Sequence, residues 1–174
     1  MVLEWRNSRR IRTNMLDDSI TLESCHRKFL NSLAVDPSKA YFVVELNGLP
    51  VASIYFTDLD TSCVTWGCYI GVEKLIPGLF IALLILAAKF AFYHYQARTL
   101  RSEVAAHNDN PIRLNRFVGI QKGQNIKKIT SGGVETEFIE YRFERCEFNS
   151  VCEKALKIMP SSVKEAVGNY VLED

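Results

Sequence analysis

Apolar residues at helical spacing predict two helices at the start of the chain. Residues 3–16 read as one helix, with Leu3, Ile11 and Met15 as its apolar positions. A second helix is expected to begin near Thr21, whose hydroxyl suits an N-cap, and to stop before Pro37.

An alternating pattern then replaces the helical one. Residues 40–46 read as a strand, and Asn47-Gly48 is a strong signal for a two-residue hairpin turn. Its partner is expected over residues 50–58, and a third strand over 62–70. Because both faces of the first strand are largely apolar, we expect a sheet covered by other elements on both sides.

The centre of the chain carries a strand-helix-strand unit. The third strand leads through a loop at 71–77 into an apolar helix over 78–95, which is followed by a strand over 100–106. A further helix over 111–118 is expected to end at Gly119. Only one such crossover is present, so the sheet is predicted to be mixed rather than doubly wound.

The chain ends in a strand pair and a tail. Residues 120–130 and 134–144 read as antiparallel strands. We predict an α/β fold with a mixed, mostly antiparallel sheet and helices on both faces. It forms a domain over residues 1–144, and a helical tail over 145–174 packs on it or extends from it.

The apolar central helix raises the question of a membrane span. Its uninterrupted apolar stretch, 79–88, is short beside the roughly 20 residues that a span needs. Lys89 follows immediately. We therefore predict the buried helix of an α/β sheet, without stable membrane insertion.

Composition excludes several kinds of site. The formal net charge of +1 gives no electrostatic case for nucleic acid. Five cysteines without a C-x-x-C pair or a secretory signal predict reduced thiols and a cytoplasmic location. Cys25-His26 lacks the spacing of metal ligands, so no metal is expected.

Two central segments have the residue order of a known family. Residues 108–120 read N-x-x-P-I-R-L-N-x-x-V-G-I, and residues 75–80 read L-I-P-G-L-F. They resemble the N-x-x-A-I-x-L-Y-x-x-x-G-F and Q/R-x-x-G-x-G/A segments of the GNAT acetyl-CoA N-acetyltransferases. In the second segment only Gly78 matches, because Leu75 and Phe80 replace the basic or amide residue and the second small residue. The resemblance covers the chain to about residue 144.

This resemblance implies a GNAT-like fold and a cofactor site. In that family the strands flanking the crossover helix splay apart, and the pantetheine arm of acetyl-CoA lies in the gap. Backbone amides at the helix start hold the pyrophosphate, as free N–H groups and the helix dipole allow. The implied co-substrate is acetyl-CoA, and the implied binding residues are Ile70, Val72, Ile76, Gly78, Phe80, Ile81 and Asn108.

The opening of the chain resembles one subgroup of the family. Trp5-Arg6-Asn7 and the residues after it, to His26-x-x-Phe29, are similar to nucleotide-sugar amine acetyltransferases, including those of the pseudaminic-acid pathway. This implies a UDP-linked amino sugar as the acceptor. Arg6 and Asn7 could meet its phosphate or uracil. Three further residues could stack on sugar or base, or instead pack in the core: Met15, Phe56 and Trp66.

Members of the family normally begin with a strand before the W-R-N segment. Here Trp5 lies close to Met1. We expect that this first strand is missing from the sheet or lies upstream of the sequence. A homodimer is possible, although loss of an edge strand would alter its contacts.

Acetyl transfer to an amine needs a neutral amine, stabilisation of an oxyanion and a proton for the thiolate. The family glutamate falls at Thr65, so Glu103 and His107 are the candidate bases, unless a water chain suffices. Asn115 replaces the tyrosine that protonates the thiolate, and it could orient a water or the thiolate. The tyrosines that could substitute remain unranked: Tyr55, Tyr69 and Tyr141.

The sequence thus predicts an acyl-CoA-dependent N-acetyltransferase acting on a nucleotide-linked amino sugar. One alternative is an acetyltransferase for a protein N-terminus or other small amine. The other is a degenerate, non-catalytic GNAT-fold binding module.

Overall fold

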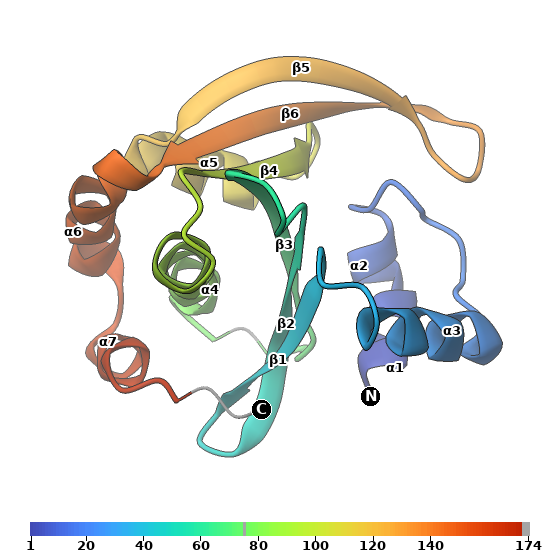
Figure 1. Cartoon of the computed structure of the whole chain (residues 1–174), viewed down its shortest axis with the longest axis horizontal. Helices are drawn as coiled ribbons and strands as arrows, with labels where there is room; N and C mark the ends of the chain where they lie inside the picture. The colour runs from blue at the N-terminus through green and yellow to red at the C-terminus, as the bar shows by residue number, and fades with distance from the viewer. Residues whose placement is uncertain (75, 172–174) are drawn as a thin grey trace.

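A six-stranded sheet separates two groups of helices (Figure 1). The computed structural model describes residues 1–74 and 76–171. The spatial strand order is β1-β2-β3-β4-β6-β5, and all neighbours are antiparallel except β3 and β4. The predicted α/β class with a mixed, mostly antiparallel sheet is confirmed. The strands are β1 Ala40–Leu46, β2 Leu49–Thr57, β3 Cys63–Ile70, β4 Thr99–Ala105, β5 Gln121–Ile129 and β6 Glu135–Glu144.

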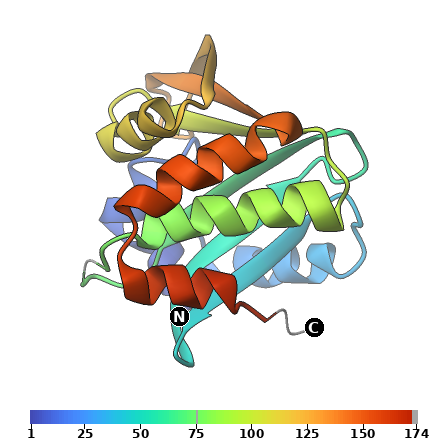
Figure 2. The ribbon, with the colours of Figure 1, turned by 90° about the vertical axis from the view of Figure 1, so that its left-hand side faces the viewer.

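Helices cover both faces of the sheet, as the apolar first strand predicted. One face carries α1, α2 and α3, and the other carries α4, α6 and α7 (Figure 1). Figure 2 shows α4 running between α6 and α7, and α5 packs against α6. The helices are α1 Val2–Asn7, α2 Arg9–Arg12, α3 Glu23–Leu33, α4 Leu79–Lys89, α5 Asp109–Val118, α6 Phe148–Ile158 and α7 Ser161–Gly168.

The β1–β2 hairpin has the turn that Asn47-Gly48 predicts. Both residues have positive φ, 54° and 73°. This is the conformation of a type I′ turn, whose twist matches that of the strands. The turn pairs Leu46 with Leu49, and a β-bulge between Val44 and Glu45 then shifts the register so that Tyr41 pairs with Tyr55. β2 in turn pairs Tyr55 with Gly67 of β3.

The predicted central helix is confirmed as α4, with a different ending. After Lys89 the helix widens into a π-helical segment over Phe90–His94, where the Tyr95 N–H donates to the Phe90 carbonyl at 3.0 Å. Most α4 side chains are buried against the sheet and the C-terminal helices. Lys89 extends to the Val167 carbonyl at 3.3 Å, near the end of α7.

The predicted single helix over residues 3–16 is wrong. Ser8 has an extended conformation, with φ −62° and ψ 139°, and divides the segment into α1 and α2. Side chains compete for the backbone there: the Ser8 hydroxyl donates to the Trp5 carbonyl, and the Arg12 Nε donates to the Asn7 carbonyl. Thr21 is not an N-cap either, since Leu22 occupies that position of α3.

β3 and β4 pair only at their beginnings. Cys63, Val64 and Thr65 face Thr99, Leu100 and Arg101, and the pairing ends there. Beyond this point β3 continues beside β2 alone, and β4 continues beside β6. We call the diverging edges, residues 66–70 of β3 and 102–105 of β4, the split.

The hydrophobic core lies between the sheet and α4, α5, α6 and α7. Its largest fully buried side chains include Phe56, Phe92 and Phe143. The tail helices contribute Val151, Ala155, Val163 and Val167 to the same cluster. A division into residues 1–144 and 145–174 therefore separates parts that share one core, and it stays a prediction.

None of the described helices is long and apolar enough to cross a membrane. Within residues 1–74 and 76–171, no group of His, Cys, Asp and Glu side chains is arranged to hold a metal ion. The five cysteines are all free thiols. Burial raises the pKa of Cys68 to about 12 and that of Cys152 to about 11, so both thiols stay protonated at neutral pH.

Candidate active site

A cavity of about 390 Å³ lies on the face of the sheet that carries the N-terminal helices. Its volume falls in the range of small-molecule sites. The aromatic rings of its wall come from α3 and from β1, β2 and β3: Phe29, Tyr41, Tyr55 and Tyr69. The ionisable groups that line it are Arg6, Asp17, His26 and Lys39.

Three tyrosines lie across the strands beneath this cavity. The rings of Tyr41 and Tyr55 stack, with centroids 6.2 Å apart and an angle of 12° between their planes. The Tyr41 hydroxyl contacts the Tyr69 hydroxyl and donates to the Ser53 Oγ at 3.1 Å. Burial raises the pKa of Tyr55 to about 12 and raises the pKa of Tyr41 further, so both phenols remain protonated.

Two glycines of β3 and its following loop make room for aromatic rings. A Cβ on Gly67 would lie 2.2 Å from the Tyr55 Cζ and Oη. A Cβ on Gly71 would lie 2.0 Å from the Trp5 ring. The Tyr55 ring therefore crosses the backbone of β3, and Trp5 anchors α1 at the end of that strand.

Arg6 lines the cavity and is largely buried. Its side chain is only 13% exposed, and its Nη2 donates to the Asp17 carbonyl. The Asp17 carboxylate is 3.8 Å away. The other terminal nitrogen, Nη1, is buried and has no hydrogen-bond partner among residues 1–74 and 76–171. A buried donor without a partner is costly, so this position favours a ligand that accepts a hydrogen bond.

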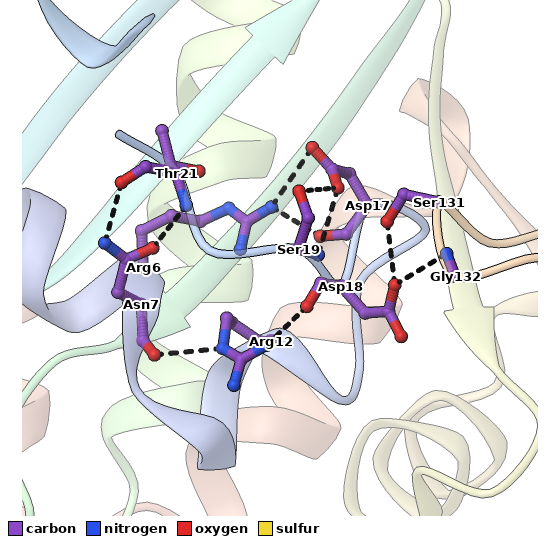
Figure 3. A network of polar contacts seen from close by, with 9 residues as sticks. All are labelled: Arg6, Asn7, Arg12, Asp17, Asp18, Ser19, Thr21, Ser131 and Gly132. Atoms are coloured by element: carbon purple, nitrogen blue, oxygen red, sulfur yellow. Dashed lines mark hydrogen bonds and ion pairs between the residues drawn. The ribbon is translucent and has the colours of Figure 1, made fainter. Parts of the chain in front are cut away.

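A network of polar contacts fixes the loop between α2 and α3 (Figure 3). The Asn7 side chain binds both backbone groups of Thr21, accepting at 2.8 Å and donating at 2.9 Å. Arg12 binds the carbonyls of Asn7 and Asp18. The Asp18 carboxylate accepts from the Ser131 hydroxyl at 2.7 Å. The loop that carries Met15 and Asp17 is thereby tied to the β5–β6 turn.

We expect acid to weaken the hydrogen bonds that Asp17 and Asp18 accept in this loop. A hydrogen bond from Ser131 lowers the pKa of Asp18, and one from Ser19 lowers that of Asp17. A carboxyl whose pKa is lowered in the folded state stabilises the fold at pH values above its ordinary pKa of about 4. This contribution is lost as the pH falls through the lowered pKa. The free energy of unfolding, measured with urea, should therefore fall below about pH 4, and less steeply in Asp18→Asn. The exposed Asp60→Asn serves as control, and an identical pH dependence in both variants would contradict the assignment.

The N-terminus of α4 lies on the opposite side of the split and has free donors. The Ala82 N–H makes the first helical bond, to the Gly78 carbonyl, and no side chain of residues 1–74 or 76–171 caps the helix. The N–H groups of Phe80 and Ile81 are therefore open to an anion. Gly78 itself has φ +82° and lies against Pro160 of the α6–α7 turn. The Phe80 side chain is partly buried and packs on the core.

The other residues of the expected cofactor site lie nearby in the chain. Ile70 ends β3, and Ile76 lies in the loop before α4, where the described residues omit Leu75. The Val72 N–H contacts the Val51 carbonyl at 3.4 Å. Asn108 occupies the N-cap of α5 without a side-chain cap hydrogen bond, so its amide is available to a ligand.

The three predicted catalytic residues have different surroundings. His107 is exposed, and its Nε2 lies 3.0 Å from the Thr13 carbonyl, so Nε2 carries a proton and donates it. Glu103 is paired with Lys128. Asn115 is 5% exposed and lies on the core side of α5 with Leu114 and Val118.

Comparison with known proteins shows which proteins this chain and its geometry resemble. No family model matches the chain. The curated acetyltransferase PseH of Campylobacter jejuni is 28% identical over 114 residues, which cover 66% of this chain and 71% of PseH. The structure of PseH with acetyl coenzyme A has a TM-score of 0.61 at 20% identity, covering 83% of this chain and 88% of PseH. Vibrio cholerae spermidine N-acetyltransferase, with CoA and spermine, has a TM-score of 0.77 at 14% identity, covering 85% and 90% of the two chains.

The fold is that of the GNAT N-acetyltransferases. The expected resemblance to this family and to its PseH-like members is confirmed. The sequence relative supports acetyltransferase activity. The split between β3 and β4 corresponds to the splayed strands that the GNAT resemblance implied.

Thr65, at the position of the GNAT glutamate, has an acidic neighbour that sequence reasoning missed. Its hydroxyl donates to the Asp58 carboxylate at 2.7 Å and accepts from the Arg101 Nε at 3.1 Å. Asp58 follows β2 with φ +63°. An aspartate after a strand reads as a turn residue, so the sequence carries no signal that this carboxylate reaches Thr65.

The predicted substrate residues of this GNAT fold divide into two groups. Arg6 and Met15 line the cavity. Phe56 borders it, but the residue is 1% exposed and its ring packs on Phe42 and Phe90 in the core. Asn7 instead holds Thr21, and Trp66 is 7% exposed within the core cluster. The alternation of β3 explains Trp66, because neighbouring residues along a strand point to opposite faces. Tyr69 lines the cavity and Trp66 points toward α4.

Proposed function

We propose that this protein transfers the acetyl group of acetyl-CoA to the amine of a nucleotide-linked amino sugar. The observation that carries the acceptor class is the unpaired, buried Nη1 of Arg6 in the wall of an aromatic cavity. A phosphate oxygen would satisfy this donor, and an arginine suits phosphate better than a lysine does. The resemblance of the chain's opening to nucleotide-sugar amine acetyltransferases supports the same acceptor.

The residues on the α4 side of the split fit acetyl-CoA. When bound, acetyl-CoA supplies an acetyl thioester. The free N–H groups of Phe80 and Ile81 would hold its pyrophosphate at the positive end of the α4 dipole. The uncapped amide of Asn108 would hold the pantetheine arm, for which the diverging edges of β3 and β4 offer backbone groups.

The side chains that line the cavity suit an acceptor that is anionic and partly aromatic. Arg6, His26 and Lys39 line it against the single carboxylate of Asp17. Lys39 also pairs with Asp36 at 2.7 Å, which leaves Arg6 as the buried cation with a free donor. The rings of Phe29 and Tyr41 offer faces to a base or sugar. A polyamine acceptor would instead meet like charges.

The amine must lose a proton during transfer. Glu103 is neutralised by Lys128, whereas His107 donates through Nε2 and keeps Nδ1 as an acceptor when neutral. We propose that His107 takes the amine proton through water, since its ring does not line the cavity. Asn115 stands where the GNAT resemblance implies a tyrosine that protonates the departing CoA thiolate. An amide cannot supply that proton, so another group must do so.

Steady-state kinetics with two acceptors test the proposal. The wild type should release CoA thiol faster with a UDP-linked 4-amino-4,6-dideoxy sugar than with spermine. Arg6→Gln should raise KM for the UDP sugar by about tenfold or more and change kcat less, because one charge-assisted hydrogen bond to phosphate is lost.

The matched control is Arg9→Gln, which changes an exposed arginine of the neighbouring helix. It should leave both constants unchanged. Faster turnover of spermine than of the UDP sugar would contradict a nucleotide-sugar acceptor. Equal effects of the two arginine substitutions would contradict it as well. Acetyl-CoA binding without turnover of any amine would favour a non-catalytic binding module.

A further inference from the structure

The Tyr55 hydroxyl occupies a distinctive place at the split. Tyr55 pairs with Gly67, and its Cζ and Oη lie directly over that glycine. Gly67 is the second residue of β3 after pairing with β4 has ended at Thr65. The hydroxyl therefore lies where the two strands diverge, on the side of the acceptor cavity, which Tyr55 lines.

The ring is held in this place from two sides. Tyr41 stacks on one face of it, and Phe29 of α3 packs edge-on against Tyr41. Beneath the ring, the missing Cβ of Gly67 lets the phenol approach the backbone of β3. The position is thus set by packing, because no hydrogen bond to the Tyr55 hydroxyl is found within residues 1–74 and 76–171.

The other tyrosines named by the sequence have different situations. The Tyr69 hydroxyl is occupied by Tyr41, which also bonds Ser53. Tyr141 lies in the core cluster, on β6, and pairs with Ser102 on the far edge of β4 from β3. Tyr55 is therefore the tyrosine that combines a free hydroxyl with a place on the split.

We propose that Tyr55 is a catalytic residue that gives its hydroxyl proton to the sulfur of the departing CoA. This rests on the proposed function. The amine nitrogen forms a bond to the acetyl carbon, and the carbon–sulfur bond breaks with its electron pair left on sulfur. Sulfur takes the proton of the Tyr55 Oη. His107 takes the proton released by the amine nitrogen through water and passes it through water to the phenolate, so the net change moves one proton from nitrogen to sulfur.

The surroundings of the phenol suit a donor rather than a base. Burial is the main cause that raises the pKa of Tyr55, so the proton is present throughout the neutral range. The charged groups close enough to influence it are Glu103 of β4, which acts to retain the proton, and Arg6, which acts to release it. Glu103 favours the neutral phenol before the reaction, and the Arg6 cation stabilises the phenolate once the proton has left.

Calorimetric binding tests the contact with sulfur without any turnover. At about pH 9 part of the CoA thiol is ionised. Wild type should bind CoA about tenfold more tightly than desulfo-CoA, because the phenol donates to the thiolate. In Tyr55→Phe this ratio should fall toward one. The control is Tyr95→Phe, which removes the hydroxyl of another half-buried tyrosine, whose ring packs on Phe56. It should keep the wild-type ratio.

Turnover gives the second reading. Tyr55→Phe should lower kcat with the UDP sugar by about 100-fold and leave KM for acetyl-CoA unchanged, the pattern of a group that acts on the leaving sulfur. An unchanged CoA to desulfo-CoA ratio in Tyr55→Phe, or a wild type that binds neither ligand, would overturn this role. The proposed function fails separately, when CoA is bound with the expected ratio and no amine is acetylated.

Discussion

Gly67→Ala is expected to lower acetyl transfer about as far as Tyr55→Phe, by roughly 100-fold. The new Cβ would lie 2.2 Å from the Tyr55 Cζ and Oη, well inside contact distance. The ring cannot tilt away freely, because Tyr41 stacks against it. The hydroxyl must leave the split, and we expect the overpacking to destabilise the fold by about 1–3 kcal/mol. Initial rates with the UDP sugar and a thermal melt of the same sample measure the two effects.

The control for Gly67→Ala is Gly168→Ala, whose added Cβ would have no atom within 4 Å. It should keep full activity. A double variant, Gly67→Ala with Tyr55→Phe, should be no less active than the worse single variant, because both changes remove the same hydroxyl from the same place. Full additivity of the two losses would show that Gly67 acts through something other than Tyr55.

Gly78→Ala is expected to destabilise the protein by about 3 kcal/mol through two effects. Its φ of +82° strains any residue with a Cβ, by about 1–3 kcal/mol. The same Cβ would lie 2.6 Å from the Pro160 Cδ, which adds overpacking. For a chain of this size the melting temperature should drop by roughly 6–12 °C.

Gly133→Ala separates the two causes. Gly133 has a similar φ of +78°, but an added Cβ would have no neighbour within 4 Å. Its loss of stability measures backbone strain alone. The excess loss in Gly78→Ala should shrink when Pro160→Ala removes the contacting Cδ. Equal melting temperatures for Gly78→Ala and Gly133→Ala would refute a packing role for the α6–α7 turn at this glycine.

Local sequence patterns predicted the sheet well because its strands alternate or carry long apolar runs. The β1 bounds, 40–46, agree with the structure, and the Asn47-Gly48 turn joins β1 to β2 as predicted. The β-bulge between Val44 and Glu45, which shifts the register of the pair, was not predicted. The break at Ser8 could not be predicted in this way. The side chains of Ser8 and Arg12 bind backbone carbonyls there, and Asn7 binds Thr21, a contact between residues 14 positions apart that no local propensity records.

The candidate site could be predicted only in part, for the same reason. The helix α1 and the loop after α2 had to fold together before Arg6 and Met15 shared one cavity. Phe56 and Trp66 were grouped with them because aromatic rings suit stacking, but strand parity directs both rings to the core face, where the two residues pair across β2 and β3. The place of Tyr55 depends on the register of β2 against β3, which decides that a glycine lies beneath the ring.

The covering of α4 has a consequence for solubility. An all-round apolar helix left open on one side would expose a patch large enough to promote aggregation. Here α6 and α7 flank α4 on the side away from the sheet, with Val151, Ala155, Val163 and Val167 buried in the shared core (Figure 2). The C-terminal helices thus act as the hydrophilic coat of the crossover helix. A shortened chain that ended after β6 would be expected to collect in inclusion bodies.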